Sequence, residues 1–455
     1  MNNELKKDIH KDKAVIEIKE EKNLKRKYPA SFTGSLIIAF SVLFLLTVLP
    51  SFSASSDSVN ITFWHTMRRG NKEALNELLK KFQKENPDIV VDIVAINSRD
   101  PRMGNDYSAL YSKLLESIAQ KKAPNVAQVY ENWTTQFIEI DTLVPVDSFK
   151  DGLNAKDLQD FFPIFKEANT FNGKLWTLPF NKSIYVLYYN KSLFKGQNLS
   201  YPKTWDEVRT TAQKLTIRNG DEVSQYGLVF APSVDMFGHY LYAHGGEFIS
   251  GDTAVFANPT GIKDLEFWVE LTNTDRTALP SFNAFDDFVK QKGAMYVDST
   301  SRIGQMMKNC PFEYGIAQMP TGSTRSYQFA GTNLAIFNTG NAAQQNASWR
   351  LVKFLTNTEN NAFWSINTGY LPVRQSTAGS PQFQQYMKSR PDYNVALQSL
   401  QYAKVQPKNP AWESIRGFIN DAMYEAISQT ATPSQALEKA ATYSNGLLKS
   451  MKGRN

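Results

Sequence analysis

The feature that most constrains this chain is a strand–helix–strand–helix–strand pattern that begins shortly after residue 54. Three short apolar runs, at residues 60–64, 89–96 and 125–130, are predicted strands. Two stretches between them, residues 71–85 and 107–119, repeat their apolar residues at helical spacing. Apolar strands separated by helices predict an α/β fold, in which a mostly parallel sheet carries helices on both faces.

Ligands of such sheets bind beyond the carboxyl ends of the strands, next to helix N-termini. The residues that follow the three predicted strands are His65 with Thr66, the segment 98–107, and Glu131 to Trp133. The sequence therefore predicts a cleft at this edge of the sheet.

A second α/β region follows, and the chain then returns to the first. The expected elements are a strand at 184–189, helices at 205–215 and 259–272, a strand at 329–337, a helical stretch at 345–366 and further helices from about 376. We expect two lobes, each a doubly wound mostly parallel sheet, joined by crossing hinge strands. The predicted division is residues 55–178 with 331–375 for the first lobe, and 179–330 with 376–455 for the second.

The first 54 residues form a separate, charged segment. A basic cluster at residues 22–27 precedes an apolar run at 32–49, and Ser51-Phe52-Ser53-Ala54 offers small residues for a signal peptidase. This pattern predicts an export signal cleaved near Ala54; an uncleaved membrane anchor is the alternative, because the run can just span a bilayer. In both cases the protein is expected to work outside the cytoplasmic membrane.

Composition argues against several functions. Residues 1–54 hold 9 basic and 6 acidic side chains, leaving 41 and 38 elsewhere with no basic stripe, so nucleic-acid binding is not expected. The single cysteine, Cys310, is expected to be structural. Four histidines without metal-ligand spacing, and the absence of nucleotide-binding or nucleophile motifs, predict neither cofactor nor metal and no catalysis.

The segment 179–205, PFNKSIYVLYYNKSLFKGQNLSYPKTW, carries the clearest functional signal. We interpret PFNKS as a turn that places small polar groups at the start of a strand, and Thr204 to Glu207 as a capping box with Trp205 at the first helical position. This segment, with FWHTM (63–67), QVYE (128–131) and TGYLP (368–372), resembles the extracellular solute-binding proteins of bacterial ABC importers. Within them it is most similar to the branch that binds glycerol-3-phosphate and glycerophosphodiesters.

The resemblance implies a two-lobe type II periplasmic-binding fold with a ligand between the lobes. It also implies eight ligand-binding residues: Tyr107, Glu131, Ser183, Trp205, Ser299 (or its neighbour Thr300), Gly331, Tyr370 and Arg416. The chemistry of these side chains is consistent with these roles. Arg416, tyrosine and serine hydroxyls and a glycine N–H can donate to a phosphate, Glu131 can accept from two hydroxyls, and Trp205 offers an apolar wall.

The function expected from the resemblance is capture of glycerol-3-phosphate or a glycerophosphodiester, such as glycerophosphocholine, by a monomer that delivers it to the membrane subunits of an ABC permease. One alternative keeps the importer but replaces the ligand by a neutral sugar or glycosyl-glycerol. A remote alternative is a glycoside hydrolase that uses Glu131 and Asp298. A membrane-anchored interaction module would need repeats or an exposed apolar face, which the sequence does not indicate.

Overall fold

The computed structural model describes residues 58–97 and 106–452. The predicted export signal or anchor at residues 1–54 lies outside these residues, as does most of the segment 98–107. In the described residues no helix is long and apolar enough to cross a membrane. Contacts within the chain separate residues 1–54 from residues 55–455.

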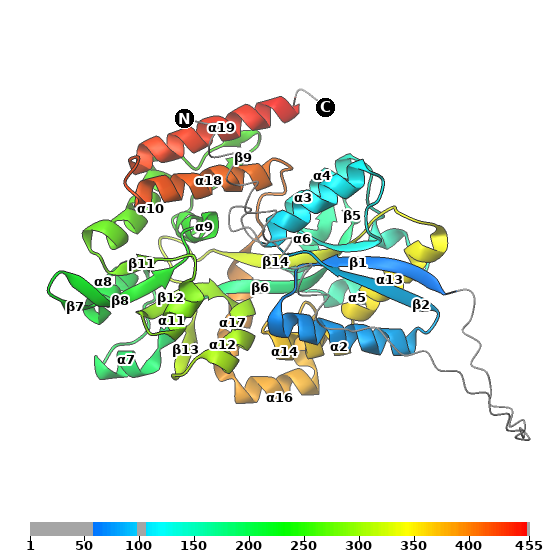
Figure 1. Ribbon diagram of the computed structural model, residues 1–455, viewed down its shortest axis with the longest axis horizontal. Coiled ribbons are helices and arrows are strands. Elements are labelled where there is room, and N and C mark those ends of the chain that lie inside the picture. Colours follow the sequence, from blue (N-terminus) through cyan, green and yellow to red (C-terminus); the bar gives the residue numbers. More distant parts are fainter. Residues whose placement is uncertain (1–57, 98–105, 453–455) are drawn as a thin grey trace, which may run out of the picture. The chain divides into compact units, whose positions relative to one another are not determined.

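One continuous sheet runs through this unit (Figure 1). Its strands, in spatial order, are β11 (Ala278–Pro280), β8 (Glu222–Phe230), β12 (Gly293–Ser299), β6 (Thr177–Asn190), β14 (Tyr327–Ile336), β3 (Val126–Val129), β1 (Val59–His65) and β2 (Ile89–Ala95). The short strands β13 (Tyr314–Ala317), β15 (Ala403–Lys404) and β7 (Ile217–Asn219) attach to β6, β14 and β8 respectively. Two separate hairpins are β4 (Thr170–Phe171) with β5 (Lys174–Leu175), and β9 (Ile249–Ser250) with β10 (Thr253–Ala254).

Each end of this sheet is parallel, as the sequence predicts. Strand β1 pairs in parallel with β2 and β3, and β8 pairs in parallel with β11 and β12. The two ends meet at β6 and β14, which run antiparallel to each other. Strand β6 continues past its pairing with β14 to pair with β12, while β14 pairs with β6 along one edge and with β3 along the other. These two strands therefore join the lobes, and the expected two-lobe α/β fold is confirmed. The exact residue boundaries of the lobes stay a prediction.

Helices cover the sheet on both sides (Figure 1). Those of the β1 end are α2 (Arg69–Glu85), α3 (Asp106–Ala119), α4 (Glu131–Glu139), α5 (Ala155–Asp160), α6 (Pro163–Asn169), α13 (Ala342–Leu355) and α14 (Thr358–Thr368). Those of the β8 end are α7 (Lys191–Gly196), α8 (Trp205–Leu215), α9 (Val234–Ala243), α10 (Pro259–Val269), α11 (Ala284–Val289), α12 (Ile303–Asn309), α18 (Trp412–Ile427) and α19 (Pro433–Lys452). Between them in the chain lie α15 (Gln375–Gly379), α16 (Pro381–Ser389) and α17 (Asn394–Ser399).

The crossing strands contain a bulge that only glycine fits. The register between β6 and β14 shifts between Thr332 and Asn333. One residue earlier, Gly331 has a φ of +97°, and a Cβ on it would lie 1.9 Å from the carbonyl oxygen of Asn181. A side chain there would collide with the neighbouring strand, so the close approach of the two strands depends on this glycine.

The structure corrects one sequence interpretation and refines two others. The PFNKS segment is not a turn: all five residues are buried within β6, because β14 extends far enough to pair with them. The helical stretch expected at 345–366 consists of two helices, α13 and α14, because Asn357 starts α14 by accepting a hydrogen bond from the Asn360 N–H. The capping box at α8 is half formed: Thr204 accepts from the Glu207 N–H, but the Glu207 carboxylate accepts from Lys203 instead of Thr204.

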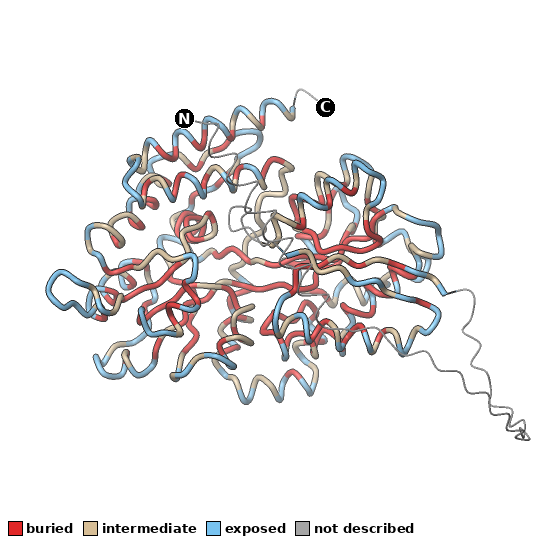
Figure 2. The backbone as a smooth tube through the Cα atoms, in the orientation of Figure 1, coloured by how far each residue is buried: buried red, intermediate tan, exposed pale blue. Residues whose placement is uncertain are grey.

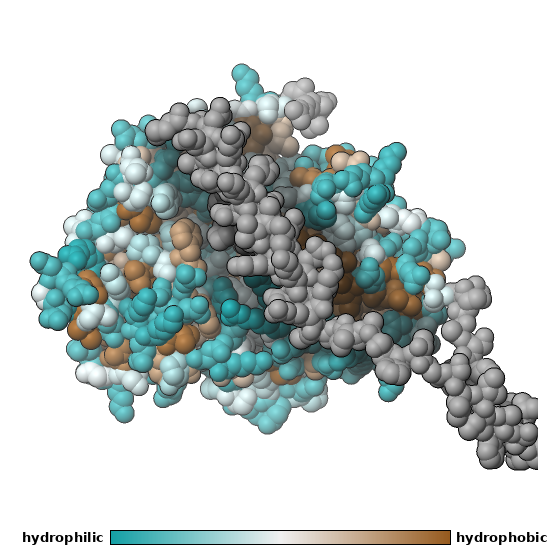
Figure 3. Space-filling view, viewed as in Figure 1, coloured by the Kyte–Doolittle hydropathy of each residue, from teal (hydrophilic) through white to brown (hydrophobic). Residues whose placement is uncertain are grey.

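The buried residues follow the sheet, and the outer faces of the helices are exposed (Figure 2). A large hydrophobic cluster runs through both ends of the sheet, and a smaller one lies under α3 and α4. Where grey atoms do not cover the face seen in Figure 3, hydrophilic residues dominate, and the largest group of hydrophobic residues lies right of centre. The burial of these apolar side chains stabilises the sheet and its helices, which hold the polar groups at the strand ends in place.

Candidate ligand-binding cleft

A cavity of about 250 Å³ lies beside the crossing strands, where groups from both lobes meet. We call it the inner cavity. Six of the eight predicted residues line it: Tyr107, Ser183, Ser299, Gly331, Tyr370 and Arg416. They come from α3, β6, β12, β14, the loop after α14, and α18, so segments more than 300 residues apart supply one cavity. Their contact with a ligand stays a prediction.

Arg416 is held in place by an acidic partner from another helix. Its Nη1 and Nη2 lie 2.9 and 3.0 Å from the two carboxylate oxygens of Asp235, in the first turn of α9. Nη1 also donates to Gln406 Oε1 at 3.0 Å. Tyr185 donates its hydroxyl to Asp235 Oδ2 at 3.2 Å, so the carboxylate is itself oriented. This two-pronged geometry fixes the plane of the guanidinium group.

The same pair sets the charge of the cavity wall. Burial opposes ionisation of Asp235, but the Arg416 guanidinium outweighs it and holds the pKa of that carboxyl below its ordinary value. Burial likewise opposes the charge of Arg416, and the Asp235 carboxylate raises the pKa of Arg416 above its ordinary value. Both groups are therefore charged at neutral pH, and their charges cancel locally.

A second arginine, Arg302, lines the cavity from the turn between β12 and α12. Arg302 Nε donates to Asp298 Oδ2 at 3.0 Å, and the Tyr296 hydroxyl donates to the same oxygen. The Asp298 carboxylate raises the pKa of Arg302 above its ordinary value. Arg302 was not among the eight residues predicted to bind the ligand, and neither were the other polar residues of the cavity: Tyr130, Asn132, Tyr185, Asp235, Ser301, Gln406 and Glu413. Tyr185 lies in the segment 179–205, but no spacing rule marked it or Asp235 as a site residue.

The tyrosines of the cavity are held by ring contacts. Tyr370 stacks on Trp364, with ring centroids 5.6 Å apart and planes 6° apart. Tyr107 meets Tyr130 edge to face at 5.1 Å and accepts a hydrogen bond from Asn181 Nδ2 at 3.3 Å. Burial raises the pKa of both Tyr107 and Tyr370, so both hydroxyls are neutral and can donate to a ligand.

Glu131 does not line the inner cavity. It starts α4, and its Oε1 lies 2.6 Å from Nζ of Lys182, a fully buried residue of β6. The same oxygen accepts from Asn333 Nδ2 at 3.1 Å. Burial lowers the pKa of Lys182, and Glu131 opposes that shift. In this structure the Glu131 carboxylate neutralises a buried cation where the strands cross; its expected bond to ligand hydroxyls stays a prediction.

The expectation that Trp205 forms a wall of the site is corrected. Trp205 is 1% exposed, and its ring packs against Tyr240, Phe267 and Trp268 at centroid distances of 5.2, 5.9 and 5.5 Å. Because the start of α8 is pressed against α9 and α10, the indole faces the core of the lobe and not the cavity. Among the expected alternatives at the serine position, Ser299 lines the cavity and Thr300 is buried beside it, where its hydroxyl accepts from the Ile184 N–H.

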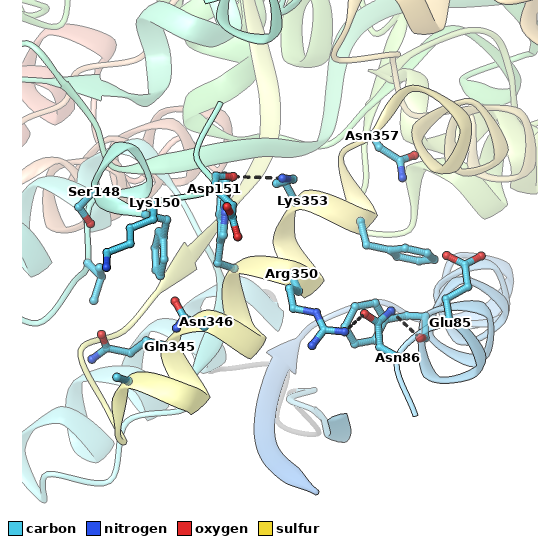
Figure 4. Close-up of a pocket in the computed structure, with 16 residues that line it drawn as sticks. Glu85, Asn86, Ser148, Lys150, Asp151, Gln345, Asn346, Arg350, Lys353 and Asn357 are labelled. Carbon is cyan, nitrogen blue, oxygen red and sulfur yellow. Dashed lines mark hydrogen bonds between the residues drawn. The ribbon is translucent and has the colours of Figure 1, made fainter. Parts of the chain in front are cut away.

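A larger hollow of about 850 Å³ lies away from the cleft, between the end of α2, the loop after α4 and helix α13 (Figure 4). None of the predicted residues lines it. Its arginine and one of its lysines already have partners: Arg350 pairs with Asp88 at 2.6 Å, and Lys353 donates to the carbonyl of Asp151 at 3.1 Å. Figure 4 shows both side chains pointing across the hollow toward these neighbouring segments. In the described residues no cluster of metal-binding side chains is present.

Two lobes joined by crossing strands, with a polar cavity between them, define a protein that encloses a small solute. The sequence model of the bacterial extracellular solute-binding proteins matches residues 77–391, so the chain belongs to that family. Its members are the substrate-binding components of ABC importers and not enzymes, which confirms the predicted class and rules out the glycoside hydrolase alternative.

Relatives include the sn-glycerol-3-phosphate-binding periplasmic protein UgpB of Pectobacterium atrosepticum, 25% identical over 94% of this chain and 98% of that protein. A putative binding protein of Brucella abortus is 23% identical over 82% of this chain and 89% of its own length.

Among solved structures, UgpB of Mycobacterium tuberculosis in complex with glycerophosphocholine has a TM-score of 0.74 at 22% identity, covering 87% of this chain and 99% of that one. The acarbose-binding GacH receptor of Streptomyces glaucescens also has a TM-score of 0.74, at 21% identity, covering 86% and 99%. At these identities the structures establish the fold.

Proposed function

We propose that the inner cavity binds glycerol-3-phosphate or a glycerophosphodiester such as glycerophosphocholine, for delivery to an ABC permease. The observation that carries the proposal is the presence of two guanidinium groups, Arg302 and Arg416, with serine and tyrosine hydroxyls in one cavity of about 250 Å³. Guanidinium and hydroxyl donors are the groups that recognise phosphoryl oxygens.

The geometry of Arg416 leaves donors for a ligand. Three of its five N–H groups are used by Asp235 and Gln406, and the remaining two have no acceptor among the residues that the structure describes. A phosphoryl group that accepts from them would bind to a guanidinium already fixed in orientation, which reduces the entropy lost on binding. The names of the relatives, which include glycerol-3-phosphate-binding proteins over nearly the full chain, support the same ligand class.

The second candidate is a neutral sugar or glycosyl-glycerol, and one observation favours it. Because Asp235 cancels the charge of Arg416, and Asp298 that of Arg302, the cavity does not require an anion to satisfy its arginines. Structural neighbours bound to acarbose and cycloalternan are consistent with such a ligand.

Isothermal titration calorimetry on the purified protein separates the two candidates. The ligands are glycerol-3-phosphate, glycerophosphocholine, glucosylglycerol, sucrose and trehalose. Binding of the phosphate esters alone supports the proposal. Binding of the neutral glycosides alone keeps the importer class and replaces the substrate.

A further inference from the structure

A second chamber adjoins the inner cavity. Of the eight predicted ligand-binding residues, Tyr107 and Tyr370 are the two that line it. It has a volume of about 400 Å³ and shares four lining residues with the inner cavity: Tyr107, Ser301, Arg302 and Tyr370. We call it the outer chamber. It lies between the start of α2 on the first lobe and the elements α11, β12 and α12 of the second. A ligand longer than the inner cavity would therefore extend past Tyr370 and Arg302 into this space.

An aromatic side chain at the rim of the outer chamber is exposed without an evident structural reason. Phe282 is 79% exposed, more than any other large hydrophobic side chain in the described part of the chain. Its loop is held on both sides, since the Ser281 N–H donates to the Phe230 carbonyl at 2.9 Å. The Ser281 hydroxyl accepts from the Asn283 N–H at 3.0 Å and donates to Asp287 at 2.6 Å. The phenyl ring is thus presented by an anchored loop, and exposing it costs free energy that covering it would recover.

The polar groups of the outer chamber suit an uncharged partner. Among the described residues that line it, the cations are Arg68, Arg69 and Arg302 and the anions are Asp106, Asp286 and Asp298, so their formal charges balance. Asn71, Asn283 and Gln305 add three amides, each able to donate and accept. A sugar or cyclitol ring has hydroxyls at its edge and C–H groups on its faces. Planar polar side chains can hydrogen-bond to the hydroxyls, and an aromatic ring can pack against the C–H groups.

We propose that the outer chamber is a subsite for a hydroxylated ring, a sugar or a cyclitol, covalently joined to the group held in the inner cavity, with Phe282 as its stacking platform. This inference rests on the proposed function, because it needs the inner cavity to hold the first part of the ligand. It deepens that function: the preferred ligand is a glycerophosphodiester with a ring head group, or a glycoside of at least two units, and not glycerol-3-phosphate itself.

The test compares two ligand pairs by calorimetry: glycerol-3-phosphate with glycerophosphoinositol, and glucose with trehalose. One of the two pairs is expected to bind. Within that pair, we expect the larger ligand to bind about tenfold more tightly than the smaller one, the gain expected from one stacked ring and its hydrogen bonds. Phe282→Ala should remove that advantage and leave the affinity for the smaller member unchanged. The matched control is Tyr424→Ala on α18, since Tyr424 is 60% exposed and lines neither cavity.

The outcomes are distinct. If the smaller ligand binds but the ring adds no affinity, or if Phe282→Ala leaves the advantage intact, the subsite is overturned while the proposed function stands. If no phosphate ester and no sugar binds, the proposed function fails and the subsite with it. Because Phe282 is exposed, its substitution should not unfold the protein, and unchanged binding of the smaller ligand verifies this in the same experiment.

Discussion

Arg416 and Asp235, which are 181 positions apart in the chain, form a two-pronged ion pair on the wall of the inner cavity. The pair links α18 to α9 and is oriented further by Gln406 and Tyr185. It gives the cavity a rigid guanidinium group without a net positive charge. A ligand assigned to this cavity must therefore be compatible with the neutral Arg416–Asp235 pair, and the presence of an arginine alone does not indicate an anionic ligand.

Arg416→Ala should lower the affinity for a phosphate ester at least about thirtyfold, since a buried charge-assisted contact is worth about 2 kcal/mol or more. Titration calorimetry with glycerol-3-phosphate measures this. Arg416→Ala also leaves Asp235 buried without its cation, so the double variant Arg416→Ala/Asp235→Ala separates ligand contact from that penalty. Arg350→Ala, at an exposed ion pair outside the cleft, is the control. Wild-type affinity in both cleft variants would contradict the phosphate assignment.

Asp235→Asn should strengthen phosphate-ester binding about fivefold (~1 kcal/mol) at low salt, because it removes a negative charge near the ligand while keeping an amide oxygen for Arg416. Affinity for a neutral glycoside should stay the same. The measurement is calorimetry at low and high ionic strength. Weaker phosphate-ester binding by Asp235→Asn would contradict this: it would mean that the carboxylate contributes more by orienting Arg416 than it costs by repelling the phosphate.

Glu131→Ala should destabilise the fold by about 3–5 kcal/mol, because it leaves Lys182 charged and buried without its partner. Urea unfolding followed by tryptophan fluorescence gives the value. The double variant Glu131→Gln/Lys182→Met, which removes both charges, should recover most of the loss. If the folded Glu131→Ala protein loses ligand binding while the double variant regains stability but not binding, the carboxylate also contacts the ligand.

Trp205→Ala should lower the free energy of unfolding by about 3–5 kcal/mol, as expected for a large side chain removed from a packed core. Trp205→Phe should cost less. Both variants should bind ligand with wild-type affinity when assayed well below their melting temperatures. A loss of affinity in Trp205→Phe with an unchanged melting temperature would return this residue to the binding site.

Stability should fall as pH drops from about 6.5 toward 4. Burial, helped in His65 by Lys72, lowers the pKa of both His65 and His239 to about 4, although Asp235 opposes the shift in His239. In this window the unfolded chain takes up protons at these histidines and the folded chain does not, so protonation favours unfolding by roughly 1.4 kcal/mol per pH unit for each histidine. Urea midpoints at several pH values measure the slope, and His239→Gln should reduce it by about half. An unchanged slope would show that His239 does not titrate this way.

The sequence by itself determined the order of strands and helices and the parallel pairing at each end of the sheet, because the periodicity of apolar side chains is a local property. Together with the resemblance, it also indicated six residues that line one cavity, from Tyr107 to Arg416. Local sequence patterns predicted secondary structure less reliably where pairing with a neighbouring strand decides the conformation. The PFNKS segment looks like a turn in isolation and is a strand because β14 pairs with it.

The tertiary structure alone decided which charges meet and which aromatic rings face the cavity. Arg416 pairs with Asp235, which α9 brings into place, although Glu413 lies only three positions before Arg416 on α18 and accepts from the Trp133 indole N–H instead. The position of Trp205 was indicated by its motif, yet packing of α8 against two other helices turned its ring inward. Ion pairs and ring contacts between distant segments depend on how helices dock, and no spacing along the chain encodes that docking.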